Sequence, residues 1–270
     1  MPRFSYLSHR RCCQSRQFYD KRIIFSTGYR APTAWELPNE TRQRKGNQDL
    51  DPEKMRSMEL GLGYTFSKKG HISLQGYYNV IDDLILEVET GDINPNPETT
   101  YWNRNRNIGK ATILGLEFNS DYNLTDRVAI YANYTYSYGE YKNLPESLIS
   151  SPAAHDGESI PNIPKHKINA GVTYHILQDL SVHLRSNYVY NRKTIQSNPT
   201  RNVDRYILFH ANICWDNAIA DGLYFQLLIR NLLDNDDAFN PGIRTATGEY
   251  YPTQQPIESR NIWLTAGYRF

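Results

Sequence analysis

The sequence predicts an all-β fold, an antiparallel up-and-down transmembrane β-barrel of which this chain supplies a part. Apolar and polar residues alternate with a period of two over many segments of the chain. Short turn-like links alternate with long polar links between those segments. No apolar run approaches the ~20 residues that a membrane-spanning helix needs, and the mean hydropathy is −0.66. Strands that put every second residue into lipid are compatible with this low value.

Residues 127–139, RVAIYANYTYSYG, show the alternation most clearly. The even-numbered residues, which share one face of a strand, are Val128, Ile130, Ala132, Tyr134, Tyr136 and Tyr138. The other parity carries mainly small and polar residues, so the segment is a strand with one apolar face. Residues 167–176 and 180–190 divide in the same way, with Lys167, His183 and Arg185 on the polar parity.

The same division fits further segments along the chain. They are residues 21–29, 58–66, 72–80, 114–122, 207–215, 223–229 and 262–270. A weaker pattern covers residues 3–8. Together these segments predict roughly ten or eleven strands, and none shows the 3.6-residue period of a helix.

The links between the strands predict how the sheet is arranged. The short links are residues 66–70, 123–127, 177–180 and 216–222. The long links are residues 31–52, 86–106, 141–162, 192–201 and 235–258. Because the two kinds alternate, every tight turn falls at one rim and every long loop at the other, as in outer-membrane barrels.

A soluble β-sandwich would also show a period of two, but its strands would be nearer the ~5 to 6 residues typical of globular sheets. These segments are long enough to cross a bilayer when tilted, and their tyrosines gather toward segment ends as in interfacial girdles. The polar parity is too polar for a dry core. It includes Glu117, Asn119, Asp121, Lys167, His183, Arg185 and His210. We therefore expect one face in lipid and the other against water or a polar plug.

Composition and motifs exclude several other classes. The net charge of +1 does not favour a nucleic-acid partner. Cys12, Cys13 and Cys214 show no zinc-ligand spacing and no disulfide framework. The motifs GxSxG, HExxH and GxxxxGK are absent, and His166, His175, His183 and His210 are scattered. We therefore predict no catalytic residue, no metal site and no cofactor, with the histidines as polar wall residues.

Five motifs occur in one order along the chain. They are GYRAP (28–32), LDPEKMRSMELGLGY (50–64), NIGKATILGLEF (107–118), NLLDNDDAFNPG (231–242) and QQPIESRNIWLTAGYRF (254–270). This series resembles the C-terminal half of the barrel of TonB-dependent outer-membrane receptors. The resemblance covers nearly the whole chain from about residue 21.

The resemblance implies a larger barrel of about 22 strands around a globular plug. It implies energy-coupled import of a bulky nutrient across the outer membrane of a Gram-negative bacterium. A ferric siderophore is the expected substrate, with haem and cobalamin as alternatives. The implied partners are an inner-membrane energy-coupling complex, the barrel-assembly machinery, the plug with the N-terminal barrel half, and outer-membrane lipid including lipopolysaccharide.

The chain lacks the secretory signal, coupling box and plug of that family and has about half of its strands, so we expect a truncated or split product. Residues 1–20 are expected to be a degraded or irregular N-terminal segment, with one broken strand as an alternative, and residues 21–270 the C-terminal barrel part. An open half-barrel would leave strand edges unpaired in lipid. The alternatives are a small self-closed barrel acting as pore, adhesin or enzyme, and a non-functional remnant.

The long links supply candidate ligand-binding residues. In YWNRNRN (101–107), Tyr101 and Trp102 lie beside Arg104 and Arg106, a grouping able to hold an anionic chelate by charge-assisted hydrogen bonds and stacking. Tyr250 and Tyr251 near the last long link could add polar contacts. Loops that face lipopolysaccharide also carry such residues without binding any nutrient.

The last predicted strand, 262–270, keeps its alternation up to Phe270. Its apolar parity consists of Ile262, Leu264, Ala266, Tyr268 and Phe270. The family resemblance implies that Tyr268 and Phe270 also form the signal read by the barrel-assembly machinery.

Overall fold

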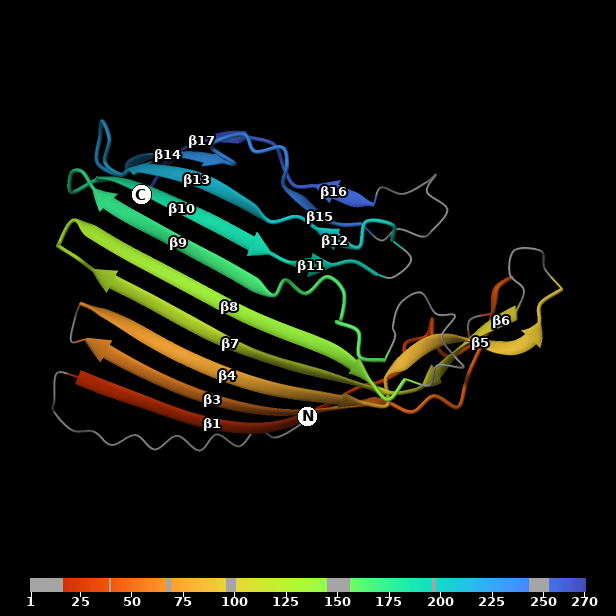
Figure 1. Ribbon diagram of the computed structural model, residues 1–270. Helices are drawn as coiled ribbons and strands as arrows, with labels where there is room; N and C mark the ends of the chain where they lie inside the picture. The colour runs from red at the N-terminus through yellow and green to blue at the C-terminus, as the bar shows by residue number, and fades with distance from the viewer. Residues whose placement is uncertain are drawn as a thin grey trace.

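Ten strands form one antiparallel sheet in chain order in this computed structural model, which describes residues 17–38, 40–66, 69–95, 101–144, 156–195, 198–242 and 253–270 (Figure 1). They are β1 (Gln17–Arg30), β3 (Glu53–Phe66), β4 (Gly70–Asp82), β7 (Lys110–Asn123), β8 (Val128–Lys142), β9 (His166–His175), β10 (Leu180–Tyr190), β13 (Tyr206–Trp215), β14 (Leu223–Arg230) and β17 (Asn261–Tyr268). The predicted all-β antiparallel fold is confirmed. The weak pattern at 3–8, and most of the predicted irregular segment 1–20, lie outside the described residues.

Seven shorter strands lie within the long links, which the sequence did not predict. β2 (Arg44–Lys45), β5 (Ile85–Ile93) and β6 (Tyr101–Asn107) form a three-stranded sheet. β11 (Arg192–Lys193) pairs with β12 (Asn202–Val203), and β15 (Phe239–Pro241) pairs with β16 (Gln254–Pro256). No helix among the described residues is long and apolar enough to span a membrane.

Short and long links alternate along the ten-stranded sheet, as predicted. The short links after β3, β7, β9 and β13 lie at one end of the sheet, and the long links lie at the other (Figure 1). Backbone hydrogen bonds close the short links, such as Lys69 N to Phe66 O at 2.8 Å. We call the two ends of the sheet the short-link end and the long-link end.

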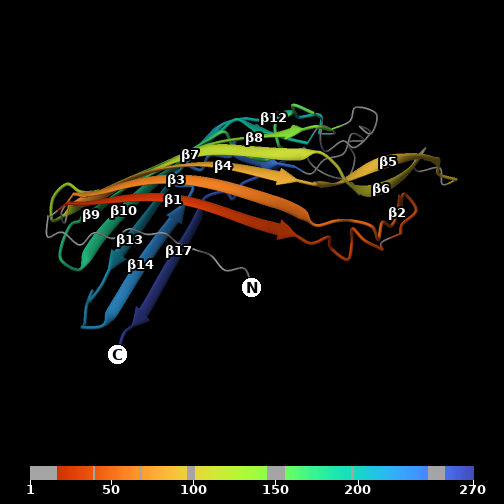
Figure 2. The same cartoon turned by 90° about the horizontal axis from the view of Figure 1, so that it is seen from below.

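The sheet is curved and open, with β1 and β17 as its outer strands (Figure 2). Within the described residues, β1 pairs with β3 and β17 pairs with β14, and no pairing joins β1 to β17. Each outer strand therefore presents one row of backbone donors and acceptors that the described part of the chain does not pair.

The two faces of the sheet differ in chemistry as the period of two predicts. Large aliphatic side chains are exposed on one face, which we call the apolar face, and Leu62 is 58% exposed there. Amide side chains bond across strands on the opposite, polar face. Asn133 donates to Asn119 at 2.7 Å, and Asn187 donates to Asn169. These four asparagines are in register across β7, β8, β9 and β10.

The strands are strongly staggered. A single in-register row on the apolar face contains Tyr19, Tyr64, Ile72, Ser120, Ala132, Ala170, Ser186 and Phe209. The row begins near the short-link end of β1 and finishes near the long-link end of β13. Such a shift means that strands cross the wall at a tilt, which closing a sheet into a barrel requires.

The pattern of the two faces inverts at the long-link end of β3, β4, β7 and β8. The apolar face there ends in a charged in-register row of Lys54, Asp82, Lys110 and Lys142. The polar face carries Met55, Ile81, Ala111 and Tyr141 at the next position. Ala111 is only 2% exposed, Ile81 and Tyr141 are half-buried, and Met55 at the edge of the row is 38% exposed. The inversion marks where the strands leave the apolar band.

Tyrosine rings cover glycines on neighbouring strands of the polar face. Tyr77 is in register with Gly115, which is in register with Ser137, and the Tyr77 hydroxyl lies 2.9 Å from Ser137 Oγ. A Cβ on Gly115 would lie 2.4 Å from the Tyr77 ring and 2.6 Å from the Tyr136 carbonyl oxygen. Tyr131 over Gly171 and Tyr224 over Gly267 repeat the arrangement.

We predict that Gly115→Ala destabilises the sheet by about 1–3 kcal/mol, because the new methyl group must displace the Tyr77 ring or the neighbouring backbone. Gly76→Ala on the adjacent strand is the matched control, because its Cβ would meet only Gly115 O at 3.9 Å. Urea unfolding followed by tyrosine and tryptophan fluorescence measures both. Equal unfolding midpoints for the two variants would contradict the packing role of Gly115.

Candidate functional site

The three-stranded sheet β2–β6–β5 projects beyond the long-link end of the large sheet (Figure 1). The sheet and the described parts of the two links that contain it, 31–52 and 83–109, form a surface that we call the loop platform. This surface contains the predicted ligand-binding segment 101–107. Strand β6 lies in the middle, parallel to β2 and antiparallel to β5.

Asparagine side chains hold the two links of the platform together. Asn47 Nδ2 donates to the Asn105 carbonyl at 2.8 Å, and Asn105 Nδ2 donates to the Glu36 carbonyl at 3.2 Å. Asn107 Nδ2 donates to the Asp51 carbonyl at 2.7 Å and to the Asp83 carbonyl at 2.9 Å. Amides can donate and accept at once, so they satisfy backbone groups that irregular links leave unpaired.

An ion-pair network anchors the platform to the large sheet. Arg30, the last residue of β1, donates to Glu53 at 2.8 and 2.7 Å and to Glu36 at 3.1 and 2.9 Å. Glu53 also accepts the Ile85 amide at 2.9 Å, which ties in the first residue of β5. Burial by itself would raise the pKa of Glu53, but the hydrogen bonds from Arg30 and Ile85 outweigh it and lower that pKa.

The pKa of Glu36 is lowered for the same reason. Burial would raise the pKa of its carboxyl group, and the hydrogen bonds from Arg30 and Thr33 overcome this and lower the pKa. The same bonds raise the pKa of Arg30, so its guanidinium remains charged throughout. The network is therefore complete only while both carboxylates are ionised.

The strand geometry divides the predicted ligand-binding residues between two faces. Trp102, Arg104 and Arg106 share one parity of β6, and Tyr101 lies on the other. Arg104 Nη2 donates to Asn47 Oδ1 at 3.1 Å, and Arg106 is exposed. Lys45 joins this face, with its ammonium 5.4 Å from the centre of the Trp102 ring. Three cations and one indole are therefore gathered on one side of the platform, and Lys45 also pairs with the Asp92 carboxylate at 3.6 Å.

A second cation–aromatic pair lies on the other face, and sequence reasoning missed it. Arg44 lies 5.4 Å from the Trp35 ring centre and pairs with Glu87. Burial lowers the pKa of Arg44. Trp35 is 61% exposed. Neither residue belongs to a motif, and the only available signal was a tryptophan in a polar link.

Three guanidinium nitrogens of the platform are buried without a hydrogen-bond partner in the described part of the chain. They are Nε and Nη1 of Arg44 and Nε of Arg104. A buried donor without a partner costs free energy, so these groups are sites where an acceptor from solvent or from a ligand would be stabilised.

The remaining predicted site residues lie elsewhere. Tyr250 and Tyr251 fall outside the described residues. Tyr268 ends β17 on the apolar face, and its ring meets that of Phe270 edge-on with centroids 5.1 Å apart. These two residues are at the short-link end, far along the chain and the sheet from the platform. No group of three or more potential metal ligands occurs among the described residues.

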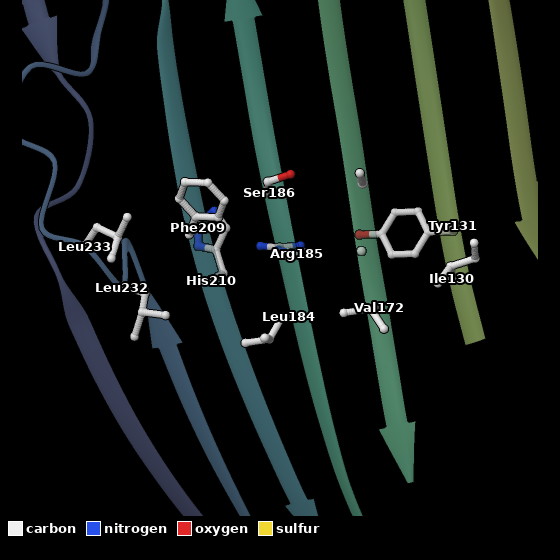
Figure 3. Close-up of a pocket in the computed structure, with 12 residues that line it drawn as sticks. Ile130, Tyr131, Val172, Leu184, Arg185, Ser186, Phe209, His210, Leu232 and Leu233 are labelled. Atoms are coloured by element: carbon white, nitrogen blue, oxygen red, sulfur yellow. The ribbon is translucent and has the colours of Figure 1, made fainter. Parts of the chain in front are cut away.

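An open hollow of about 580 Å³ lies across β8, β9, β10 and β13 (Figure 3). It forms where the small residues Ala170 and Gly171 lie between larger ones. Its wall is mainly apolar and comprises Ile130, Val172, Leu184, Phe209, Leu232 and Leu233, with Arg185 and His210 at its border. Such a wall offers a charged chelate few bonding partners, so the platform remains the candidate site.

We predict that the Arg30 network makes stability depend on pH. Both carboxyl groups have lowered pKa values in the folded chain, so their contribution is present above the unfolded pKa of about 4.3 and is lost as pH falls below it. The urea midpoint of Arg30→Gln should lie below that of wild type at pH 6, and the gap should shrink at pH 3. Arg127→Gln, in a short link, is the control. A gap that stays constant between the two pH values would contradict this assignment.

Comparison with known proteins gives the family of the chain. The family model described as "TonB dependent receptor-like, beta-barrel" matches residues 23–256. The probable TonB-dependent siderophore receptor PiuA of Acinetobacter baumannii is 26% identical over 230 residues, which are 83% of this chain and 28% of that protein. Hemoglobin-haptoglobin utilization protein B of Neisseria meningitidis serogroup C is 34% identical over 119 residues, 37% of this chain and 14% of that protein.

Solved structures show the same fold. A mutant of the ferric enterobactin receptor PfeA from Pseudomonas aeruginosa superposes with a TM-score of 0.72 at 16% identity, covering 94% of this chain and 38% of that one. The ferric-catecholate import receptor Fiu from K12 E. coli gives a TM-score of 0.67 at 21% identity, covering 93% of this chain and 33% of that one. The chain thus spans well under half the length of these proteins.

The family is one of receptors, which confirms the prediction that the chain is not an enzyme. The match begins within β1 and runs through β14 and β16, so it covers nine of the ten strands of the large sheet in whole or in part, and β17 follows it. The chain belongs to the TonB-dependent receptor family and provides part of its β-barrel.

Proposed function

We propose that the chain is the C-terminal part of the barrel of an outer-membrane receptor for energy-coupled uptake of a ferric siderophore. The observation that carries the proposal is a two-faced strand wall that bears a basic, aromatic platform at its long-link end. The relatives support the substrate class, since PiuA is a probable siderophore receptor. Haem and cobalamin remain the alternative nutrients, and a haemoglobin–haptoglobin utilization protein is also among the relatives.

The platform suits a large anionic chelate. Arg104, Arg106 and Lys45 supply charge on one face, and Trp102 supplies an aromatic surface beside them. Hydrogen bonds from charged donors to an anion are roughly twice as strong as neutral ones. Stacking on an indole adds affinity for the aromatic rings of catecholate chelates.

The unpaired edges of the large sheet support the presence of further barrel strands in the whole receptor. Unpaired backbone groups cost several kcal/mol each in lipid, so β1 and β17 need strand partners. We place the chain in a barrel completed by further strands, around a plug, in the outer membrane of a Gram-negative bacterium. Coupling to an inner-membrane energy complex, insertion by the barrel-assembly machinery through Tyr268 and Phe270, and contact with lipopolysaccharide belong to the same proposal.

The alternative of a small self-closed barrel has less support. In the described residues β1 and β17 are the two outer strands of the sheet and do not pair with each other. The receptor hypothesis explains both the unpaired outer strands β1 and β17 and the loop platform.

We predict that removing the platform charges weakens nutrient binding. The probes are a ferric catecholate chelate, haem and cyanocobalamin, titrated against the refolded chain with tryptophan fluorescence as the readout. The double variant Arg104→Gln/Arg106→Gln should bind the ferric chelate roughly tenfold or more weakly, because two charge-assisted bonds are lost. Lys69→Gln/Arg127→Gln removes the same charge at the short-link end and should bind like wild type. Equal affinity in the two double variants would contradict a role for the platform.

We also predict that the apolar face contacts lipid. Leu116→Lys, in the middle of β7, should destabilise the vesicle-inserted sheet by about 2–4 kcal/mol, because the lysine side chain would enter the bilayer. Glu117→Lys is one residue away on the polar face and should change it little. Urea titration of vesicle-inserted protein measures both variants. A larger effect at residue 117 would reverse the assignment of the two faces.

A further inference from the structure

The last long link, residues 231–260, begins with a buried bend at the long-link end of β14. Asn231 follows Arg230, the last residue of β14, and is only 1% exposed. Its φ of 47° lies in the left-handed region, which asparagine tolerates better than most residues. The chain therefore bends at Asn231 while it stays beside β13, where the Leu232 amide donates to the Phe209 carbonyl at 2.7 Å.

The Asn231 side chain joins the two ends of this link. Its Nδ2 donates to the carbonyls of Asn235 at 3.0 Å and Glu258 at 3.3 Å, and its Oδ1 accepts the Asn235 amide at 2.9 Å. Asp234 adds a second connection by accepting the Arg260 amide at 2.9 Å. Residues 231–235 and 258–260 are therefore held as one unit, which we call the link junction.

Hydrogen bonds to β13 fasten the link junction to the large sheet. Besides the bond from Leu232, Asn235 Nδ2 donates to the Ile207 carbonyl at 3.1 Å. A third bond has a side-chain acceptor, because the Asn231 amide donates to His210 Nδ1 at 3.3 Å. His210 is 6% exposed. The attachment of the junction therefore depends in part on a residue that can gain a proton.

The geometry of this bond assigns the protonation state of His210. A backbone N–H group can only donate, so Nδ1 must accept, and the ring is neutral with its proton on Nε2. In a protonated ring both nitrogens are donors. Protonation would therefore direct the Nδ1–H group at the Asn231 N–H group and replace a hydrogen bond by a repulsion.

The charged groups around His210 offer a proton there little compensation. Arg185 on β10 is in register with His210 and lies next to it in Figure 3. Arg230 on β14 and Glu258 in the link also act on the ring electrostatically. Glu258 is already paired with Arg230 at 3.2 Å, and Asp234 is paired with an arginine of the link at 3.3 Å. A proton on His210 would thus add positive charge beside Arg185, while both carboxylates of the junction are bonded to arginines.

We propose that His210 is a positioning residue for the last long link. Its neutral ring holds the link junction against β13, and protonation of Nδ1 loosens the junction. The position of this link at the long-link end thereby depends on pH between about 5 and 8, the range in which histidine ordinarily changes its charge. The inference goes beyond the proposed function and does not depend on it, because it concerns the link and not the nutrient.

The test is hydrogen–deuterium exchange of the refolded chain in detergent, measured by mass spectrometry at pH 7.5 and pH 5.0 and corrected for the intrinsic exchange rate at each pH. In wild type the protection of residues 231–235 should fall about tenfold at pH 5.0, because one hydrogen bond is lost. His210→Gln removes the titration, so its protection should be the same at both pH values. His183→Gln is the matched control, because His183 lies on the same face and bonds to Thr173 on β9, and it should keep the pH dependence of wild type.

Peptides from β8 report on the large sheet in the same samples, and their protection should not change with pH. A fall of equal size in β8 and in residues 231–235 would mean that acid loosens the whole sheet, which would overturn the proposal. Protection of residues 231–235 that is independent of pH in wild type would also overturn it. So would a fall in His210→Gln as large as that in wild type, because a purely structural role of His210 leaves the pH dependence unchanged.

Discussion

Backbone hydrogen bonding in a medium without water is the constraint on which the rest of this structure depends. In lipid a strand can satisfy its amide and carbonyl groups only through neighbouring strands, so the sheet must run without interruption. The ten strands meet this demand by antiparallel pairing in chain order, with tight links at one end. Because the backbone pairing is fixed in this way, the strands differ only in their side chains. Alternate side chains along each strand are apolar on one face and polar on the other. The stagger from Tyr19 to Phe209 tilts the wall toward closure.

At the long-link end the strands leave the apolar band, and the types of side chain on the two faces change there. Beyond the row of Tyr78 and Tyr138, outward-facing side chains become charged, and inward-facing ones such as Ala111 become buried and apolar. The buried Ala111, together with the Arg30 network, gives the links a base on which a second sheet can form. The loop platform and the charged row of Lys54, Asp82, Lys110 and Lys142 therefore share one physical origin, since both lie beyond the boundary of the apolar band.

Much of the fold was predictable because a period of two needs only the order of residues. All ten strands of the large sheet and the alternation of short and long links follow from it, and β1 begins a few residues earlier than the pattern suggested. The β2–β6–β5 sheet was not predicted, because β2 and β6 carry few apolar residues and the sheet depends on amide bonds between links distant in sequence. The pairing of Arg44 with Trp35 could not be predicted for the same reason. Within YWNRNRN, the alternation of a strand places Tyr101 on the face opposite to Trp102, Arg104 and Arg106.

The most direct test of the account is a spin-label scan along β7, with single labels at residues 113 to 119 in vesicle-inserted protein. Power saturation would compare collisions with oxygen, which dissolves in lipid, and with a water-soluble nickel chelate. The account predicts that labels at 114, 116 and 118 collide mainly with oxygen, and that labels at 113, 115, 117 and 119 do not. Oxygen access without a period of two, or labels of both parities shielded from oxygen, would contradict the claim that one face of every strand lies in lipid.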